Sequence, residues 1–247
     1  MKIWAIADLH LCFGASDKSM EFFGIAWKNY IERIEENWKK VIDNTDLILI
    51  AGDISWAINL EDAMKDLLWI DALPGTKVIL KGNHDYWWPS NKKLSETLPP
   101  SIHFINNNAV TIGEVTIGGS RLWDTSEYSF GEYIDFLENP LIQEKNLQEK
   151  ETERIYNREL KRLHLSLQQL DSKASYRVAM THYPPIGGDL KESRASKILE
   201  RFRVDVAVFG HLHNVKKECP LFGRKNRILY LFIAADYLNF EPMLVKD

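Results

Sequence analysis

Short apolar runs recur along the chain, and each one ends in a cluster of polar residues. The runs cover residues 3–7, 47–51, 78–80, 178–180 and 206–209. Runs of this length that do not alternate with polar residues are typical of strands buried on both faces. The pattern therefore predicts a layered α/β protein in which several central strands are covered on both sides.

The segments between the first three runs have helical patterns. Residues 27–44 carry apolar side chains at helical spacing with charges between them, and residues 60–73 form a second such segment that stops at Pro74 and Gly75. The order strand, helix, strand, helix, strand over residues 2–80 favours parallel strands joined by right-handed crossovers.

The middle of the chain has a different pattern. Residues 102–105, 109–112 and 115–119 are short predicted strands separated by turn residues, which indicates an antiparallel meander in a second sheet. Residues 126–172 are charged and helical in pattern, most clearly over 144–170, with too little apolar content for a separate core. We interpret 126–172 as a helical insertion or cap on one domain that spans residues 1–247.

Regular elements return in the last third of the chain. The pattern predicts strands at 177–180 and 205–209, a helix at 193–202 between them, and a last strand at 228–234. No internal repeat and no linker rich in Pro, Gly or Ser divides the sequence.

Composition narrows the class of protein. The formal net charge of −4 over 247 residues gives no electrostatic case for binding nucleic acid or an anionic membrane. No apolar run is long enough for a transmembrane helix, and the start of the chain leads directly into the first polar cluster without a signal peptide. The two cysteines, Cys12 and Cys219, form no disulfide framework, so we predict a cytoplasmic protein.

The polar clusters carry the candidate chemistry, because ligands in open α/β sheets collect beyond the carboxyl ends of the strands. Five of the seven histidines lie at these junctions. Mixed nitrogen and oxygen donors without thiolate favour Mn, Fe, Zn, Ni or Co over Ca. Seven ligands are too many for one tetrahedral site and suit two metals, the arrangement used for displacement at phosphorus. The candidate ligands are Asp8, His10, Asp53, Asn83, His182, His211 and His213.

The order of these clusters is informative in itself. Asp-x-His, Gly-Asp, Gly-Asn-His-Asp, His and Gly-His-x-His follow one another between residues 8 and 213. This series resembles the calcineurin-like metallophosphoesterase superfamily. The resemblance implies a four-layer α/β/β/α sandwich of two mixed sheets flanked by helices, with a dinuclear metal centre.

The resemblance also implies roles for the residues that match its motifs. A first metal would take Asp8, His10, Asp53 and His213, and a second would take Asn83, His182 and His211 together with Asp53, which would bridge the two. A hydroxide held by both metals would attack phosphorus in line. His84 would protonate the leaving oxygen or stabilise phosphoryl charge, and Asp85 would orient it. Mn or Fe is the expected metal, with Zn, Ni, Co and Mg as alternatives.

One departure from the family pattern excludes a substrate class. Protein Ser/Thr phosphatases of this superfamily carry Asp-Arg-Gly after the second motif, where this chain has Ile54, Ser55 and Trp56, and they end the third motif in Glu, where this chain has Asp85. The sequence is more similar to the bacterial phosphodiesterase and small phosphohydrolase branches. We therefore expect a small-molecule phosphate ester, either a monoester or a diester, as the substrate.

Candidate substrate contacts lie directly after these motifs. Trp56, Tyr86 and Trp87 could form an apolar wall for an organic group, and ordinary packing beneath the loops is the alternative for each of them. Arg121 is a candidate contact for phosphate.

Two other function classes stay open at this point. A nuclease of the same superfamily would need a basic groove, which the net charge of −4 disfavours. A metal-binding scaffold without catalysis would keep the ligands and show no hydrolysis. The sequence leaves the oligomeric state open.

Overall fold

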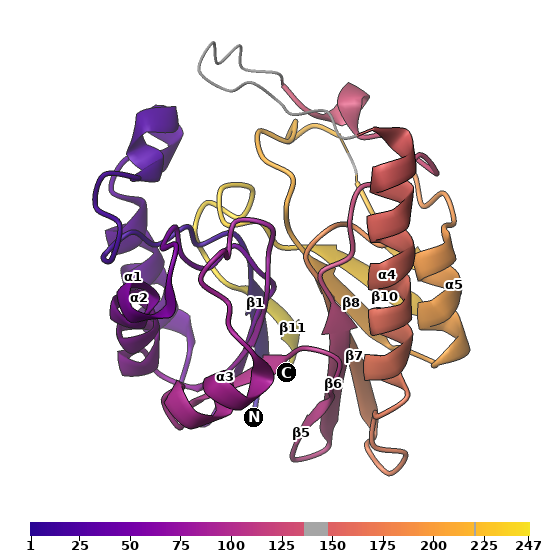
Figure 1. The fold of residues 1–247 in the computed structure, drawn as a ribbon, viewed down its shortest axis with the longest axis horizontal. Coiled ribbons are helices and arrows are strands. Elements are labelled where there is room, and N and C mark those ends of the chain that lie inside the picture. Colours follow the sequence, from indigo (N-terminus) through magenta and orange to yellow (C-terminus); the bar gives the residue numbers. More distant parts are fainter. Residues whose placement is uncertain (136–147, 220) are drawn as a thin grey trace.

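Two β-sheets packed face to face form the centre of the protein, and helices cover the outer face of each (Figure 1). The computed structural model describes residues 1–135, 148–219 and 221–247. The buried core between the sheets is made of strand residues such as Ala5, Leu49, Val178 and Val208. This arrangement confirms the predicted α/β/β/α sandwich of two mixed sheets.

The first sheet has the strand order β11-β1-β2-β3-β4. β1 to β4 are parallel, and β11 pairs antiparallel with β1. This confirms the parallel crossovers predicted for the N-terminal part. The strands are β1 (Ile3–Ile6), β2 (Leu47–Ile50), β3 (Thr76–Leu80), β4 (Ile102–Ile105) and β11 (Met243–Lys246). Its outer face is covered by α1 (Tyr30–Val41), α2 (Leu60–Ala72) and α3 (Asn91–Thr97).

The second sheet has the order β5-β6-β7-β8-β10-β9. β6, β7, β8 and β10 are parallel, and the edge strands β5 and β9 pair antiparallel. Its strands are β5 (Val110–Ile112), β6 (Val115–Ser120), β7 (Tyr176–Thr181), β8 (Val206–Phe209), β9 (Gly223–Lys225) and β10 (Ile228–Phe232). Its helices are α4 (Glu149–Leu167) and α5 (Arg194–Arg201). Short 3-10 helices lie at Met20–Phe23, Ile25–Trp27 and Gly131–Tyr133.

The predicted antiparallel meander over residues 102–119 is wrong in one respect. β4 pairs parallel with β3 in the first sheet, and only β5 and β6 form an antiparallel hairpin in the second. The reason is α3, a helix that the hydrophobic pattern did not predict. It supplies the crossover that parallel pairing needs, and Ser90 caps it by accepting a hydrogen bond from the backbone N–H of Lys93.

α4 lies within the segment predicted as a helical insertion, and it forms part of the outer layer over the second sheet. Its buried face carries Tyr156, Leu160, Leu163 and Leu167, which pack in the core beneath α4 and α5. Residues 136–147 of the predicted insertion lie outside the described residues. Within the described chain, no helix has the length and apolar character needed to cross a membrane.

The two sheets meet at the carboxyl ends of their parallel strands. Ala7 pairs with Ala234 in an isolated parallel bridge, and the backbone N–H of Ala7 donates to the carbonyl of Ile233 at 2.8 Å. The N–H of Asp8 donates to the carbonyl of Gly52 at 3.0 Å. The loops that leave β1, β2 and β10 are thereby tied to one another at a single edge.

Asp46 fastens the opposite end of the first sheet. Its buried carboxylate accepts hydrogen bonds from the N–H groups of Lys2 (2.8 Å) and Asp43 (3.1 Å) and from the indole N–H of Trp4 (3.1 Å). Burial alone would raise the pKa of Asp46, but these hydrogen bonds hold it below its ordinary value.

We predict that Asp46→Ala lowers the free energy of unfolding by about 1–3 kcal/mol at neutral pH, because three N–H donors, one of them buried, lose their acceptor. A carboxylate with a depressed pKa in the folded state stabilises the protein above its unfolded pKa of about 3.9 and loses that contribution as the pH falls further. The difference between wild type and variant should therefore shrink below about pH 4. Urea denaturation at neutral pH and below about pH 4 measures the difference in free energy of unfolding.

The exposed neighbour Asp43 provides the control, because Asp43→Ala keeps the backbone N–H that Asp46 accepts. This variant should unfold like the wild type at both pH values. A stability difference for Asp46→Ala that stays constant through the acid range would contradict the assigned role.

Candidate metal centre

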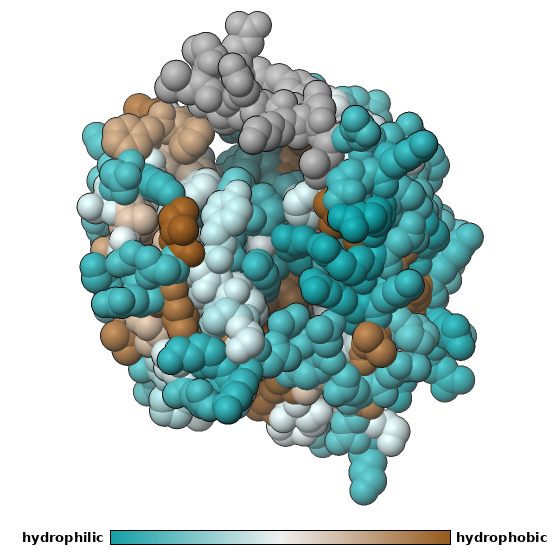
Figure 2. All heavy atoms as spheres, in the orientation of Figure 1, coloured by the Kyte–Doolittle hydropathy of each residue, from teal (hydrophilic) through white to brown (hydrophobic). Residues whose placement is uncertain are grey.

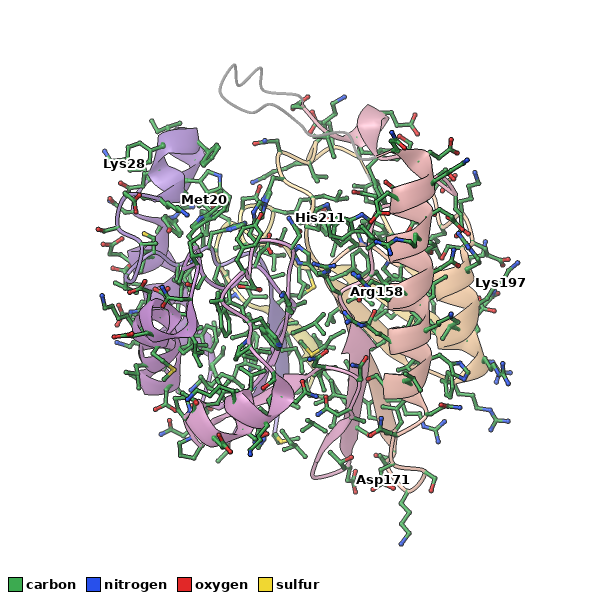
Figure 3. All side chains as sticks on the ribbon, in the orientation of Figure 1. Met20, Lys28, Arg158, Asp171, Lys197 and His211 are labelled. Atoms are coloured by element: carbon green, nitrogen blue, oxygen red, sulfur yellow. The ribbon has the colours of Figure 1, made fainter. Side chains whose placement is uncertain are left out.

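The strand-end loops bring the predicted ligands into two overlapping groups. Asp8, His10 and His213 offer ligand atoms that lie within 4.8 Å of one another, and so do Asp8, Asp53 and His182. Asp8 and Asp53 are almost fully buried, as are His10 and His182. His211 lies in the interior between the two halves of the molecule in Figure 3.

The backbone turns sharply where four of these residues leave their strands. Asp8, His10, Asp53 and His211 have positive φ angles of 59°, 46°, 51° and 75°. This left-handed conformation costs roughly 1–3 kcal/mol for a residue other than glycine, although Asp and His adopt it more readily than most residues. Strain concentrated at these loops indicates that the positions of their side chains are fixed by the surrounding fold.

Two glycines of the motifs are required by close approach between the loops. A Cβ at Gly82 would overlap the carboxylate of Asp53, and a Cβ at Gly210 would overlap the carboxylate of Asp8. Each motif therefore leaves space for the carboxylate of another motif, which explains why glycine precedes the predicted ligands Asn83 and His211.

Backbone N–H groups hold the two carboxylates in place. The N–H of His84 donates to Oδ1 of Asp53 at 2.8 Å, and the N–H of His211 donates to the carboxylate of Asp8 at 3.0 and 3.2 Å. The second oxygen of Asp53, Oδ2, faces Nε2 of His182 at 3.4 Å and Nε2 of His10 at 3.7 Å. Asp53 thus stands between imidazoles from the two groups.

A backbone carbonyl orients the imidazole ring of His182. Nδ1 of His182 donates to the carbonyl of Ala51 at 3.0 Å, which leaves Nε2 directed toward Asp53 and toward Oδ1 of Asn83 at 2.7 Å. Nδ1 of His211 lies 3.0 Å from the same oxygen of Asn83. Imidazole nitrogens from two other loops therefore converge on the side-chain oxygen of Asn83.

The donor set fits a divalent cation. Nε2 of His10 and Nε2 of His213 lie 3.3 Å apart beside the buried carboxylate of Asp8, so two imidazole nitrogens and a carboxylate face the same point. Nitrogen and oxygen donors of this kind suit first-row transition metals. Asp8, His10 and His213 would hold one ion, and the residues around Asn83 could hold another.

Protonation states in the centre are set by burial and by neighbouring charges. Burial lowers the pKa of His10 to about 3 and raises that of Asp8 to about 7. Burial would also lower the pKa of His213, but the carboxylate of Asp236 raises it to about 9. A proton on His213 occupies the side of the centre where a cation would bind, so metal binding is expected to release protons.

Comparison with known proteins identifies the family. The family model of the calcineurin-like phosphoesterases matches residues 1–215. The chain belongs to this family. It is accordingly a phosphoesterase that hydrolyses phosphate esters with the help of metal ions. Among curated proteins, no sequence matches this chain.

Solved structures similar to this phosphoesterase have low sequence identity. This chain is 15% identical to the phosphopantetheinyl hydrolase of Mycobacterium tuberculosis, and the match covers 94% of this chain and 88% of that one with a TM-score of 0.52. A protein of unknown function from Aquifex aeolicus is 16% identical over 98% and 94% of the two chains (TM-score 0.49). The anchor protein of the Plasmodium inner membrane complex is 13% identical over 96% and 72% (TM-score 0.49).

Asp236 is a residue of the phosphoesterase centre that the sequence analysis missed. Its Oδ1 lies 3.1 Å from Nδ1 of His213, and its Oδ2 accepts the N–H of Asn214 at 3.2 Å. A carboxylate behind a ligating imidazole fixes the ring and raises its basicity. Its position in the sequence could have identified Asp236, because it follows the apolar strand β10 just as the predicted ligands follow their own strands.

Asp85 and His84 have separate surroundings. The buried carboxylate of Asp85 accepts hydrogen bonds from the N–H groups of Ile54, Ser55 and Gly82 at 2.7–3.1 Å. Among the hydrogen bonds of the described residues, none joins it to the His84 ring. Asp85 therefore ties the second motif to the third, and any effect of Asp85 on His84 passes through the backbone.

The His84 ring lies at the edge of the centre and is half-buried. Its centroid is 5.7 Å from that of His10 and 4.6 Å from that of Trp56. Burial lowers its pKa, against the attraction of the Asp53 carboxylate.

The predicted aromatic contacts fall into two kinds. Trp56 stacks on His10 with ring centroids 4.8 Å apart, and Tyr86 is 62% exposed beside His84, so both border the centre. Trp87 is 2% exposed and its indole N–H donates to Asp85 at 2.9 Å, which places it in the core beneath the loop.

A pocket of about 310 Å³ opens beside His211 and was not predicted. Trp123, Tyr128 and Tyr183 contribute its aromatic walls, and Tyr183 stacks on His211 with centroids 3.7 Å apart. The indole N–H of Trp123 is buried without a hydrogen-bond partner in the described part of the chain. Trp123 lies just beyond β6, which is again a strand-end position.

We predict that Asp236→Ala weakens metal affinity by about 10- to 100-fold, because His213 loses the carboxylate that orients it. The matched control is Glu241→Ala, which removes an exposed carboxylate from the same C-terminal segment. Metal content after dialysis against graded chelator measures the effect. Equal metal retention in both variants would show that Asp236 has no part in the centre.

Proposed function

We propose that the phosphoesterase holds two divalent metals and hydrolyses a small-molecule phosphate ester, either a monoester or a diester. The observation that supports this most directly is the position of Asp53. Its Oδ1 is fixed by the N–H of His84, and its Oδ2 faces His10 on one side and His182 on the other. A carboxylate oxygen in that position can serve two cations at once.

The proposed ligand sets combine the two groups with the contacts that His182 and His211 make to Asn83. Asp8, His10 and His213 would hold one ion together with Asp53, and Asn83, His182 and His211 would hold the other together with the same carboxylate. Mn or Fe is the metal we propose for this mixture of imidazole and oxygen donors, with Zn, Ni, Co and Mg as alternatives.

The bound ions would supply Lewis acidity and an activated water at neutral pH. The protein supplies orientation. Backbone N–H groups fix the carboxylates, and the carbonyl of Ala51 and the carboxylate of Asp236 fix two imidazoles. His84 stands outside both groups and is half-buried, so a substrate can reach its ring. We assign it to hold or transfer the proton of the leaving oxygen.

The surroundings favour a compact organic substrate. Trp56 and Tyr86 border His84, and the aromatic pocket beside His211 has room for an apolar or aromatic group of the ester. Both cysteines, Cys12 and Cys219, are free thiols, which favours a reducing compartment such as the cytoplasm.

We predict about two metal ions per chain in the wild type and a loss of both ions in Asp53→Asn. The amide can direct its single oxygen either to the N–H of His84 or to the metals, and it carries no charge. Elemental analysis of the purified proteins measures this. One ion per wild-type chain, or full metal content in Asp53→Asn, would contradict a shared carboxylate. His103→Ala, which changes an exposed histidine away from the centre, is the control.

Removal of the His84 side chain should separate catalysis from metal binding. We predict that His84→Ala lowers kcat by about 10²- to 10⁴-fold, the usual contribution of general acid catalysis, while metal content stays that of the wild type. The assay compares aryl phosphomonoesters, aryl phosphodiesters and a short oligonucleotide with added Mn²⁺. Loss of metal in this variant would make His84 a ligand.

A further inference from the structure

A second pocket of about 250 Å³ lies beside α4, and its lining is strongly basic. Lys81, Arg121, Arg158 and Arg162 line it together with one acidic residue, Glu159. Figure 2 shows strongly hydrophilic residues on this face at α4, and Figure 3 labels Arg158 on the side of α4 toward the centre of the molecule, with His211 above it in the same view.

The three guanidinium groups surround a single buried carboxylate. Oε1 of Glu159 lies 3.0 Å from Arg162, 3.2 Å from Arg158 and 3.8 Å from Arg121, and the Glu159 side chain is 1% exposed. The side chains of Arg158 and Arg162 are 50% and 42% exposed at the opening. Their outer N–H groups are therefore available to an incoming anion.

This cluster has more positive charge than its structural role needs. One buried carboxylate is neutralised by one guanidinium, yet four cationic side chains face the same small cavity. Cations gathered around a concave surface repel one another and attract anions from solution. Guanidinium groups are well suited to phosphate, because they bind its oxygens in a bidentate manner.

The pocket adjoins the Asn83 side of the metal centre. Lys81 is two residues before Asn83, a separation of at most about 7 Å along the chain. The carbonyl of Arg121 accepts the N–H of His182 at 3.2 Å, and its guanidinium lies 4.5 Å from the centroid of Trp123, which lines the aromatic pocket. Arg121 was predicted as a phosphate contact, and the structure places it between the two pockets.

We propose that this basic pocket binds a second phosphate group of the substrate, a short distance from the phosphate that is hydrolysed. The volume suits one compact anionic group, since pockets for whole small molecules are usually roughly 300–1,000 Å³. The inference rests on the proposed function for the position of the first phosphate. The substrate class is then an organic phosphate ester that carries at least two phosphate groups.

The test compares a nucleoside 3′,5′-bisphosphate with the matching 5′-monophosphate and with an aryl phosphate. In Arg158→Gln/Arg162→Gln, kcat/KM for the bisphosphate should fall by about 10- to 100-fold, the loss expected for hydrogen bonds to a charged group. The value for the aryl phosphate should change less than about twofold. Arg154→Gln/Lys161→Gln removes the same charge from exposed positions of α4 outside the pocket, and it should resemble the wild type.

A binding measurement separates failure of the pocket from failure of the proposed function. Inorganic phosphate is titrated into the metal-loaded wild type and into Arg158→Gln/Arg162→Gln and Asp53→Asn. Binding that is lost in the arginine variant and kept in Asp53→Asn supports the pocket even if no ester is hydrolysed. Phosphate binding that is lost only in Asp53→Asn, or no phosphate binding by any of these proteins, overturns the proposed basic pocket. If the double variant does not fold, the single variant Arg162→Gln replaces it. This variant keeps the ion pair between Arg158 and Glu159.

Discussion

The rest of this protein depends on backbone N–H groups that donate hydrogen bonds to two buried carboxylates. The N–H of His84 holds Asp53 within the first sheet, and the N–H of His211 reaches across from the second sheet to Asp8. These bonds fix the relative position of the two sheets at their carboxyl edge. At Asp53 the hydrogen bond also leaves the other oxygen facing the imidazoles, so the donor geometry follows from how the loops meet.

That constraint determines the local sequence around the centre. Gly82 and Gly210 are present because a neighbouring carboxylate occupies the space where a Cβ would be. Asp8 and Asp53 adopt left-handed backbone conformations that cost free energy. The apolar core between the sheets stabilises the fold enough to tolerate this strain. The candidate metal centre is therefore a strained and polar region at the edge of an apolar core.

The surfaces that surround the centre differ in their chemistry. Trp56 and Tyr86, from the first sheet, border the His84 side, and loops of the second sheet form an aromatic pocket around Trp123. Residues of both sheets and of α4 line the basic pocket around Glu159. The basic pocket is lined by α4, by the end of β6 and by the ends of β3 and β4, whereas the aromatic pocket is lined by the loops that follow β6, β7 and β8. The motif residues thus gather at the centre, and the pockets beside it are formed by less regular parts of the chain and by α4.

The sequence by itself determined the apolar strands, the helices over residues 27–44 and 60–73, and the polar residues at each strand end, because these depend on local periodicity and burial. Only the tertiary structure decided that β4 joins the first sheet, that Asp236 stands behind His213, that Trp87 is buried, and that Arg121 meets Arg158 and Arg162 around Glu159. Hydrophobic periodicity reports that a segment is buried but not which segment lies against it. Contacts between residues far apart in the chain are fixed only when the two sheets pack.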